Sequence, residues 1–191
     1  MSETAKLTKD VEGAEVPVAG TYTLDLAHTT VSFVARHLMV SKVRGNFAQF
    51  EGTVTVAEDV AASSVTASIK TASVDTGEPQ RDAHLKSADF FDVETYPEMT
   101  FSSTGLRRDG SHWRLDGDLT IHGVTKPVSL DLEFNGATPD PWGGVRIGFS
   151  AATEIDREDF GMTFNMALET GGVLVSKRVK IEIEAQAIRQ P

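Results

Sequence analysis

The chain alternates apolar and polar side chains without interruption in the stretch VKIEIEAQA, residues 179–187. Successive side chains of a β-strand point to opposite faces, so this stretch turns one face to an apolar interior and the other to water. Such a pattern is typical of an antiparallel sheet that is solvated on one side. The stretch therefore predicts a long strand of an all-β fold.

The same period of two recurs upstream. It is clear in residues 113–121, 128–135 and 145–155, and shorter in 31–35 and 65–69. Gly- and Pro-containing turn signals separate these runs. Together they predict about eight antiparallel strands that follow one another along the chain.

Two segments depart from simple alternation. The apolar parity changes between Phe47 and Phe50, which indicates a bulge or sharp bend near Gln49. Residues 78–91 (EPQRDAHLKSADFF) place Pro79 and acidic residues near their start, which favours a helix. We expect one short helix in an otherwise all-β chain.

About eight strands leave no exposed edge if their sheet closes on itself, so a closed or nearly closed barrel is expected. A barrel of this size can be filled by side chains or can hold one small ligand. The inward positions carry many small residues and the chain has only 10 Phe, 2 Trp and 2 Tyr, which favours a cavity. A tightly packed sandwich is the alternative.

Composition excludes several classes of protein. The chain has 191 residues, a net charge of −10 and no cysteine, so it has no disulfide framework, thiolate zinc site or cysteine nucleophile. The acidic balance argues against broad nucleic-acid or anionic-membrane binding, which needs a concentrated positive face. Residues 1–19 lack the pattern of a secretory signal. We expect them to form a disordered tail of a cytoplasmic protein, with the barrel in 20–187 and a C-terminal tail in 188–191.

Sequence motifs for catalysis are weak. The five histidines show no local metal-ligand spacing, and no serine stands in a nucleophile elbow. Two clusters combine a base with an imidazole, Arg36-His37 and Arg81 with His84, and either could meet a polar head group at the barrel mouth. Arg81 could equally fasten the helix to the rim. Arg157 lies in a charged loop and is a further head-group candidate, although local pairing would also explain it.

The ordered set of motifs resembles the YceI family of polyisoprenoid-binding proteins, from Gly20 to Ala187. The most specific stretches are RDAHLKSADFF (81–91) and LTIHGVTKPV (119–128). Others are YTLDLAH (22–28), VSF (31–33), RHLMV (36–40), VRGNF (43–47), ASVDT (72–76) and REDFGM (157–162).

The resemblance implies an extended, lipocalin-like antiparallel β-barrel with a short helix and a long apolar cavity. It implies binding of isoprenoid quinones, polyprenyl phosphates or similar long-chain amphiphiles, and it implies no catalytic activity. We expect no cofactor and, from the spacing of the histidines, no metal site. The chain departs from many exported relatives by lacking a signal peptide. It also carries Lys177-Arg178 where relatives often have an acidic residue.

Inward parity then selects the cavity lining. The predicted lining residues are Phe33, Phe47, Phe101, Trp113, Leu115, Leu119, Leu132, Phe149, Met162 and Phe164. The predicted head-group residues are Arg36, His37, Arg81, His84 and Arg157.

The leading hypothesis is a carrier or store of an isoprenoid. One alternative is an enzyme that acts on a lipid head group through His37 or His84 with Arg81 or Arg157. Another is a stress or assembly protein with a solid barrel. A homodimer is compatible with each.

Overall fold

The computed structural model describes residues 6–191, so the part of the expected tail that falls in residues 1–5 lies outside the described residues. Strands β1 to β7 span Thr8–Val11, Ala14–Pro17, Gly20–Leu24, Thr30–His37, Ser41–Phe47, Phe50–Val56 and Ser64–Lys70. Strands β8 to β13 span Val74–Asp75, Glu98–Asp109, His112–Ile121, Val124–Pro139, Val145–Asp156 and Arg178–Arg189. The helix α1 spans Pro79–Lys86, and short 3₁₀ turns lie at Leu26–His28 (η1), Val60–Ala62 (η2), Thr71–Ser73 (η3) and Arg157–Phe160 (η4).

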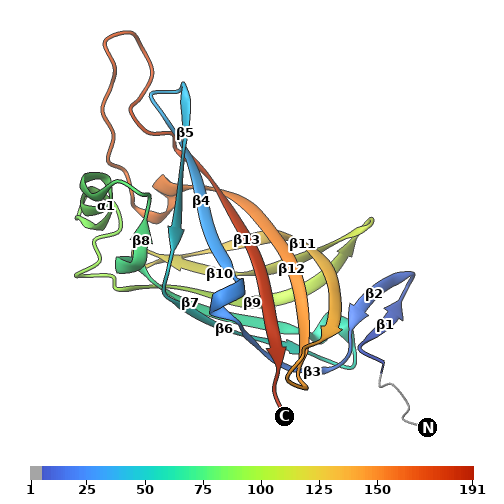
Figure 1. The fold of residues 1–191 in the computed structure, drawn as a ribbon. Coiled ribbons are helices and arrows are strands. Elements are labelled where there is room, and N and C mark those ends of the chain that lie inside the picture. The colour runs from blue at the N-terminus through green and yellow to red at the C-terminus, as the bar shows by residue number, and fades with distance from the viewer. Residues whose placement is uncertain (1–5) are drawn as a thin grey trace.

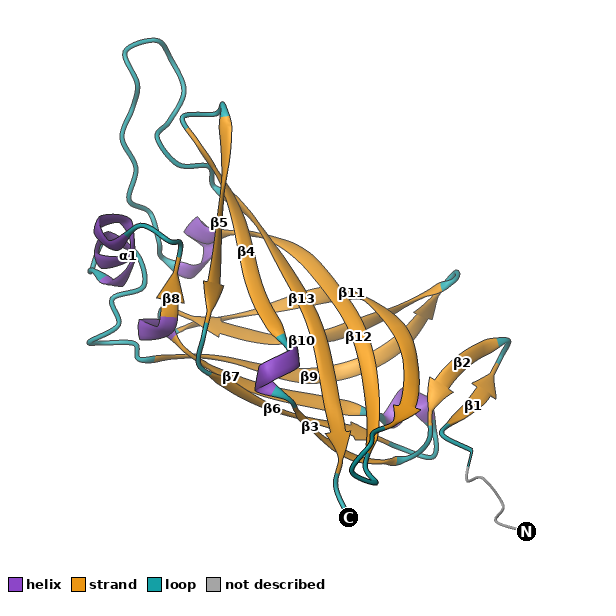
Figure 2. Ribbon diagram, viewed as in Figure 1, coloured by secondary structure: helices purple, strands orange, loops and turns teal. Residues whose placement is uncertain are grey.

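Eight strands close into an antiparallel barrel in the order β12-β11-β10-β9-β7-β6-β3-β13, with β13 pairing back to β12. The closing pair is β12 and β13, and β13 contains the longest alternating stretch of the sequence. The two strands are in register from Arg146↔Ile188 to Asp156↔Arg178. Strands β4, β5 and β8 continue the sheet beyond β13 (Figures 1 and 2). The expected barrel of about eight strands with one short helix is confirmed.

Three breaks in the chain separate strands of the closed barrel from the extension formed by β4, β5 and β8. η1 separates β3 from β4, residues 48–49 separate β5 from β6, and η3 separates β7 from β8. The bend expected near Gln49 is thus the point where the chain leaves its pairing with β4 and β8 and begins to pair with β3 and β7. The helix α1 lies beside β8, at one end of the barrel.

The helix is shorter than the expected 78–91. Glu78 caps its start, because its carboxylate accepts hydrogen bonds from the backbone N–H groups of Gln80 and Arg81. Ser87 ends it, since its hydroxyl and its N–H both donate to the carbonyl of His84. No helix among the described residues is long and apolar enough to cross a membrane.

The expected disordered leader is wrong over residues 8–17, which form a hairpin of β1 and β2. Glu12 and Gly13 make the turn, both with positive φ (54° and 80°). Val16 on β2 is only 4% exposed and packs with Val60 and Trp113. The expected C-terminal tail also shortens, because Ile188 and Arg189 still pair with Thr23 and Tyr22 as part of β13.

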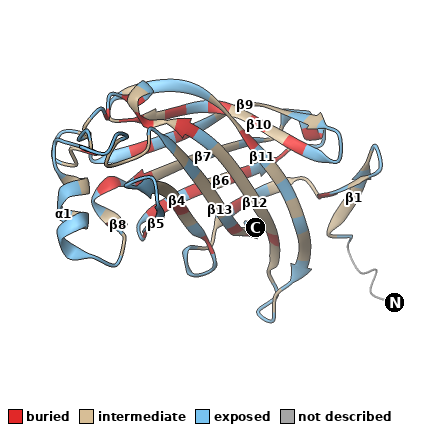
Figure 3. Cartoon of the chain, turned by 90° about the horizontal axis from the view of Figure 1, so that it is seen from above, coloured by how far each residue is buried: buried red, intermediate tan, exposed pale blue. Residues whose placement is uncertain are grey.

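The hairpin and α1 lie at opposite ends of the barrel (Figures 1 and 3). In the same two views the loop of residues 161–177, between η4 and β13, belongs to the end that carries α1. We call these the hairpin end and the loop end.

Candidate functional site

The barrel encloses an apolar cavity of about 300 Å³ that reaches from the hairpin end to the loop end. Its wall is almost entirely carbon, because alternation turns the apolar side chains of every barrel strand inward. The hollow interior excludes the packed sandwich. A cavity of this size lies at the lower end of the range for small-molecule sites.

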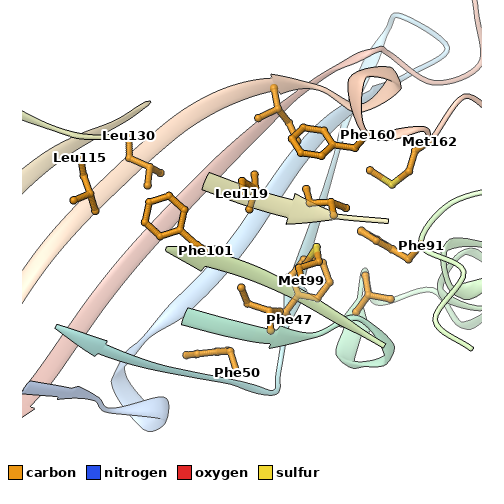
Figure 4. Packing of buried hydrophobic residues seen from close by; sticks show 14 residues of the cluster. Phe47, Phe50, Phe91, Met99, Phe101, Leu115, Leu119, Leu130, Phe160 and Met162 are labelled. Atoms are coloured by element: carbon orange, nitrogen blue, oxygen red, sulfur yellow. The ribbon is translucent and has the colours of Figure 1, made fainter. Parts of the chain in front are cut away.

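Aromatic and aliphatic side chains from different strands meet across this interior (Figure 4). Phe47 stands edge-on to Phe91, with ring centroids 5.6 Å apart, and tilts against Phe33 at 5.7 Å. Two glycines give such rings their room. A Cβ added at Gly117 would collide with the ring of Phe101, and one at Gly45 with the ring of Phe33.

Nine of the ten predicted lining residues stand on the cavity wall: Phe33, Phe47, Phe101, Trp113, Leu115, Leu119, Leu132, Phe149 and Met162. Phe164 does not. It lies in the 161–177 loop and packs edge-on against His84 and Phe90, at centroid distances of 4.9 and 5.4 Å. The parity rule fails there because the loop is not a strand.

Several lining residues were missed by the sequence. Val16 and Pro17 come from the hairpin, and Leu85, Phe90 and Phe91 come from α1 and the segment after it. The apolar pair Phe90-Phe91, which follows the short helix, could have indicated that this segment lines the cavity. Residues 1–19 contain no apolar run that could have indicated the same for the hairpin.

Arg157 is the one predicted head-group residue on the cavity wall. It opens η4 at the loop end and is only 3% exposed. Its guanidinium donates to the carbonyls of Ser176 (2.9 Å), Met162 (2.6 Å) and Val175 (3.4 Å), and it lies 5.8 Å from the ring of Phe90.

The charge of Arg157 is unusual for its burial. No carboxylate oxygen lies within 4.0 Å of it in the described part of the chain, and the neighbouring Glu158 pairs with Lys177 at 2.9 Å instead. Burial lowers the pKa of Arg157, although an arginine keeps its charge at neutral pH. The loop end of the cavity thus carries a buried positive charge beside an apolar wall.

The other four head-group candidates do not line the cavity. Arg81 donates to the hydroxyl and carbonyl of Thr76, at 2.7 and 3.0 Å, so it fastens α1 to the residue that follows β8. His84 contacts Asp89 at 2.8 Å and the ring of Phe90. Arg36 and His37 end β4 and are exposed. The histidines proposed for an enzyme are therefore not brought to the cavity with Arg157.

Comparison with known proteins agrees with this architecture. The model of the YceI-like domain matches residues 22–187. The UPF0312 protein SA2479 of Staphylococcus aureus strain N315 is 40% identical over 167 residues, which cover 86% of this chain and 95% of that protein. The hairpin lies before the residues that the family model matches.

Solved structures show the same fold. BcnA of Burkholderia cenocepacia superposes with a TM-score of 0.75 at 25% identity, covering 85% of this chain and 98% of that one. The YceI protein of Campylobacter jejuni gives 0.70 at 33% identity, with 82% and 90% covered. A polyisoprenoid binding domain from Saccharophagus degradans gives 0.67 at 16% identity, with 91% and 100% covered. The chain therefore belongs to the YceI family.

Proposed function

We propose that the protein binds an isoprenoid, either a quinone or a polyprenyl phosphate, or a similar long-chain amphiphile, and carries or stores it without changing it chemically. The cavity carries this proposal, since a wall of carbon that spans the barrel suits a chain and not a polar metabolite. Support comes from the family, and from a neighbour of the same fold that is named a polyisoprenoid binding domain.

The free energy of binding is set by the chain of the ligand. Each CH₂ removed from water contributes about 0.8 kcal/mol, so ten carbons contribute roughly 8 kcal/mol before the cost of ordering the ligand. The tail then determines affinity, while a polar head sets orientation.

Arg157 is the residue that orients the head in this proposal. It offers a buried positive charge to a phosphate or carbonyl oxygen at the loop end, where the wall is otherwise apolar. The tail then extends from Arg157 toward Trp113 and Val16 at the hairpin end.

Native mass spectrometry of the purified protein, followed by solvent extraction, tests the proposal. We expect one isoprenoid per chain. Phe149→Asp should abolish lipid binding, because an alkyl chain on the cavity wall would take the new carboxylate out of water without a partner. The variant should still fold into a barrel, although a less stable one. Thr55→Asp is the matched control, since Thr55 is exposed on β6 and carries the same change of charge.

Two results would overturn the proposal. If the purified protein has a ligand-free mass and does not bind added prenyl lipids, the proposal that it binds a lipid is wrong. If the Phe149→Asp protein co-purifies with as much lipid as wild type, the cavity is not the binding site. The expected cytoplasmic location is a separate part of the proposal, which cell fractionation tests.

A further inference from the structure

Exposed apolar side chains gather at one place on the loop end. Leu38, Met39 and Val40 form the turn between β4 and β5 and are 39%, 51% and 80% exposed, and Met166 in the 161–177 loop is 58% exposed. Both segments project beyond the barrel, side by side, at the upper left of Figure 1. We call these four residues the apolar tip.

Backbone contacts hold the two segments of the tip together. The N–H of Leu38 donates to the carbonyl of Leu174 at 2.9 Å, and the N–H of Leu174 donates to the carbonyl of Met166 at 2.9 Å. A Cβ at Gly172 would lie 3.7 Å from Cγ of Met39. The tip is thus one defined surface built from two parts of the chain.

The turn places large apolar residues where they fit the backbone badly. Leu38 and Met39 have φ of 51° and 61°, in the left-handed region that Asn and Gly adopt most easily. A turn that served only to join β4 to β5 would be more stable with Asn-Gly. Exposed Leu and Met at these positions therefore indicate a surface that contacts something apolar.

The two chain segments that carry or adjoin the tip are rich in cations, although the chain as a whole has a net charge of −10. Residues 34–44 and 173–181 contain no acidic residue, and their cations are Arg36, Lys42, Arg44, Lys177, Arg178 and Lys180. Four of these pair with carboxylates of β12, η4 and β13. Arg36 and Lys42 have no carboxylate partner among residues 6–191, whereas Glu169 is the one acid of the neighbouring loop sequence 163–172.

The tip is continuous with the loop end of the cavity. Val175 lines the cavity and forms an isolated β-bridge with His37, one residue before the tip. Two hydrogen bonds join Ser176 to Arg36. The backbone N–H of Arg36 donates to the hydroxyl oxygen of Ser176 at 2.9 Å, and the N–H of Ser176 donates to the carbonyl of Arg36 at 3.0 Å. Whatever the tip contacts is held beside the end of the cavity that contains Arg157.

We propose that the apolar tip docks the protein on an anionic lipid bilayer, with the four apolar side chains in the interface and Arg36 and Lys42 on the lipid head groups. The apolar turn is flanked by Arg36 and Lys42, which are register partners on β4 and β5, and this arrangement matches the two layers of such a surface. A second copy of the chain fits less well, since four side chains on a narrow projection fall short of the roughly 800 Å² per partner that stable interfaces bury. The lipid of the proposed function would then pass between bilayer and cavity at this end, a consequence that rests on that function.

Flotation with vesicles tests the docking without any cavity ligand. We expect wild type to bind phosphatidylcholine–phosphatidylglycerol vesicles, and to bind pure phosphatidylcholine vesicles more weakly, with binding reduced by salt. Met39→Asp with Val40→Asp should reduce binding at least about tenfold, and Arg36→Gln with Lys42→Gln about tenfold on the anionic vesicles alone. Trp142→Asp is the matched control, because Trp142 is 83% exposed in the turn between β11 and β12, far from the tip.

A second variant separates docking from folding. Leu38→Asn with Met39→Gly suits the left-handed turn, so its melting temperature should equal or exceed that of wild type while its vesicle binding falls about tenfold. Retained binding in this variant, an equal loss in Trp142→Asp, or no binding by wild type would each overturn the proposal. A dimer seen by sedimentation and abolished by Met39→Asp would assign the tip to a second copy instead. Vesicle binding by a protein without extractable lipid would contradict the proposed function alone, and lipid in a protein that ignores vesicles would contradict the docking alone.

Discussion

The two ends of the barrel differ in whether the apolar side chains beside the cavity are buried or exposed to solvent. At the hairpin end Val16 is buried against Val60 and Trp113, and the hairpin supplies part of the cavity wall. At the loop end Met39 and Val40 are left in solvent, and the wall contains the buried charge of Arg157. A protein that only needed a stable barrel would seal both ends. Under the function proposed above, the hairpin end would retain the ligand and the loop end would exchange it.

Removing Arg157 should produce the largest effect, because it would disorganise the loop end. Arg157→Leu removes the side-chain donor to the carbonyls of Met162 and Ser176, whereas the carbonyl of Val175 keeps the amide of Asn165 at 2.8 Å, and we expect a cost of about 3 kcal/mol. We expect rapid proteolytic cleavage within residues 161–177 and a lower urea midpoint.

Arg157→Lys refines this test, since one ammonium keeps the charge and cannot reach three carbonyls in the geometry of a guanidinium. It should be cleaved at an intermediate rate. Lys177→Gln is the control, because it removes only the exposed ion pair with Glu158. Cleavage of Arg157→Leu at the rate of wild type would show that the loop is held by other contacts.

Opening the hairpin end should have the next largest effect. Val16→Asp places a carboxylate among Val60 and Trp113 and should lower the free energy of unfolding by about 2–3 kcal/mol. It should also lower the amount of co-purified lipid, since the hairpin can no longer close against the barrel. Thr21→Asp, at an exposed position of β3, should change neither quantity. A Val16→Asp protein that keeps its lipid would mean that the hairpin does not retain the ligand.

The barrel itself could be predicted, because the apolar–polar alternation that specifies each strand is visible in short stretches of sequence. Each long strand alternates on its own, so parity alone placed Phe101, Leu119 and Phe149 on the cavity wall. The strand pairing that closes the sheet then follows from the need to cover edges.

The two ends could not be predicted, because their structure depends on distant contacts. The hairpin is too short to be stable alone, and Val16 becomes an anchor only when Trp113 is beside it. Phe164 was placed on the wall by parity, yet the loop that contains it has no strand period. In the sequence, Arg157 resembles a solvated residue of an acidic segment. It is buried only in the folded protein, where the 161–177 loop packs against it.

Neutralising Asp25 should have the smallest effect and shows how the hairpin end is fastened electrostatically. The carboxylate of Asp25 pairs with Arg146, next to the turn between β11 and β12, and with His28 at 2.8 Å. The hydrogen bond from Arg146, followed by that from His28, lowers the pKa of Asp25. Asp25→Asn should cost about 1 kcal/mol at neutral pH, because Arg146 keeps Asp140 as a partner at 3.4 Å. A carboxyl with a lowered folded pKa stabilises the fold above its unfolded pKa of about 4 and loses that contribution as pH falls through the folded value. Urea unfolding of both proteins should therefore show a constant difference from neutral pH down to about pH 5 and convergence in stronger acid. A difference that persisted in acid would assign the effect to packing and not to the charge of Asp25.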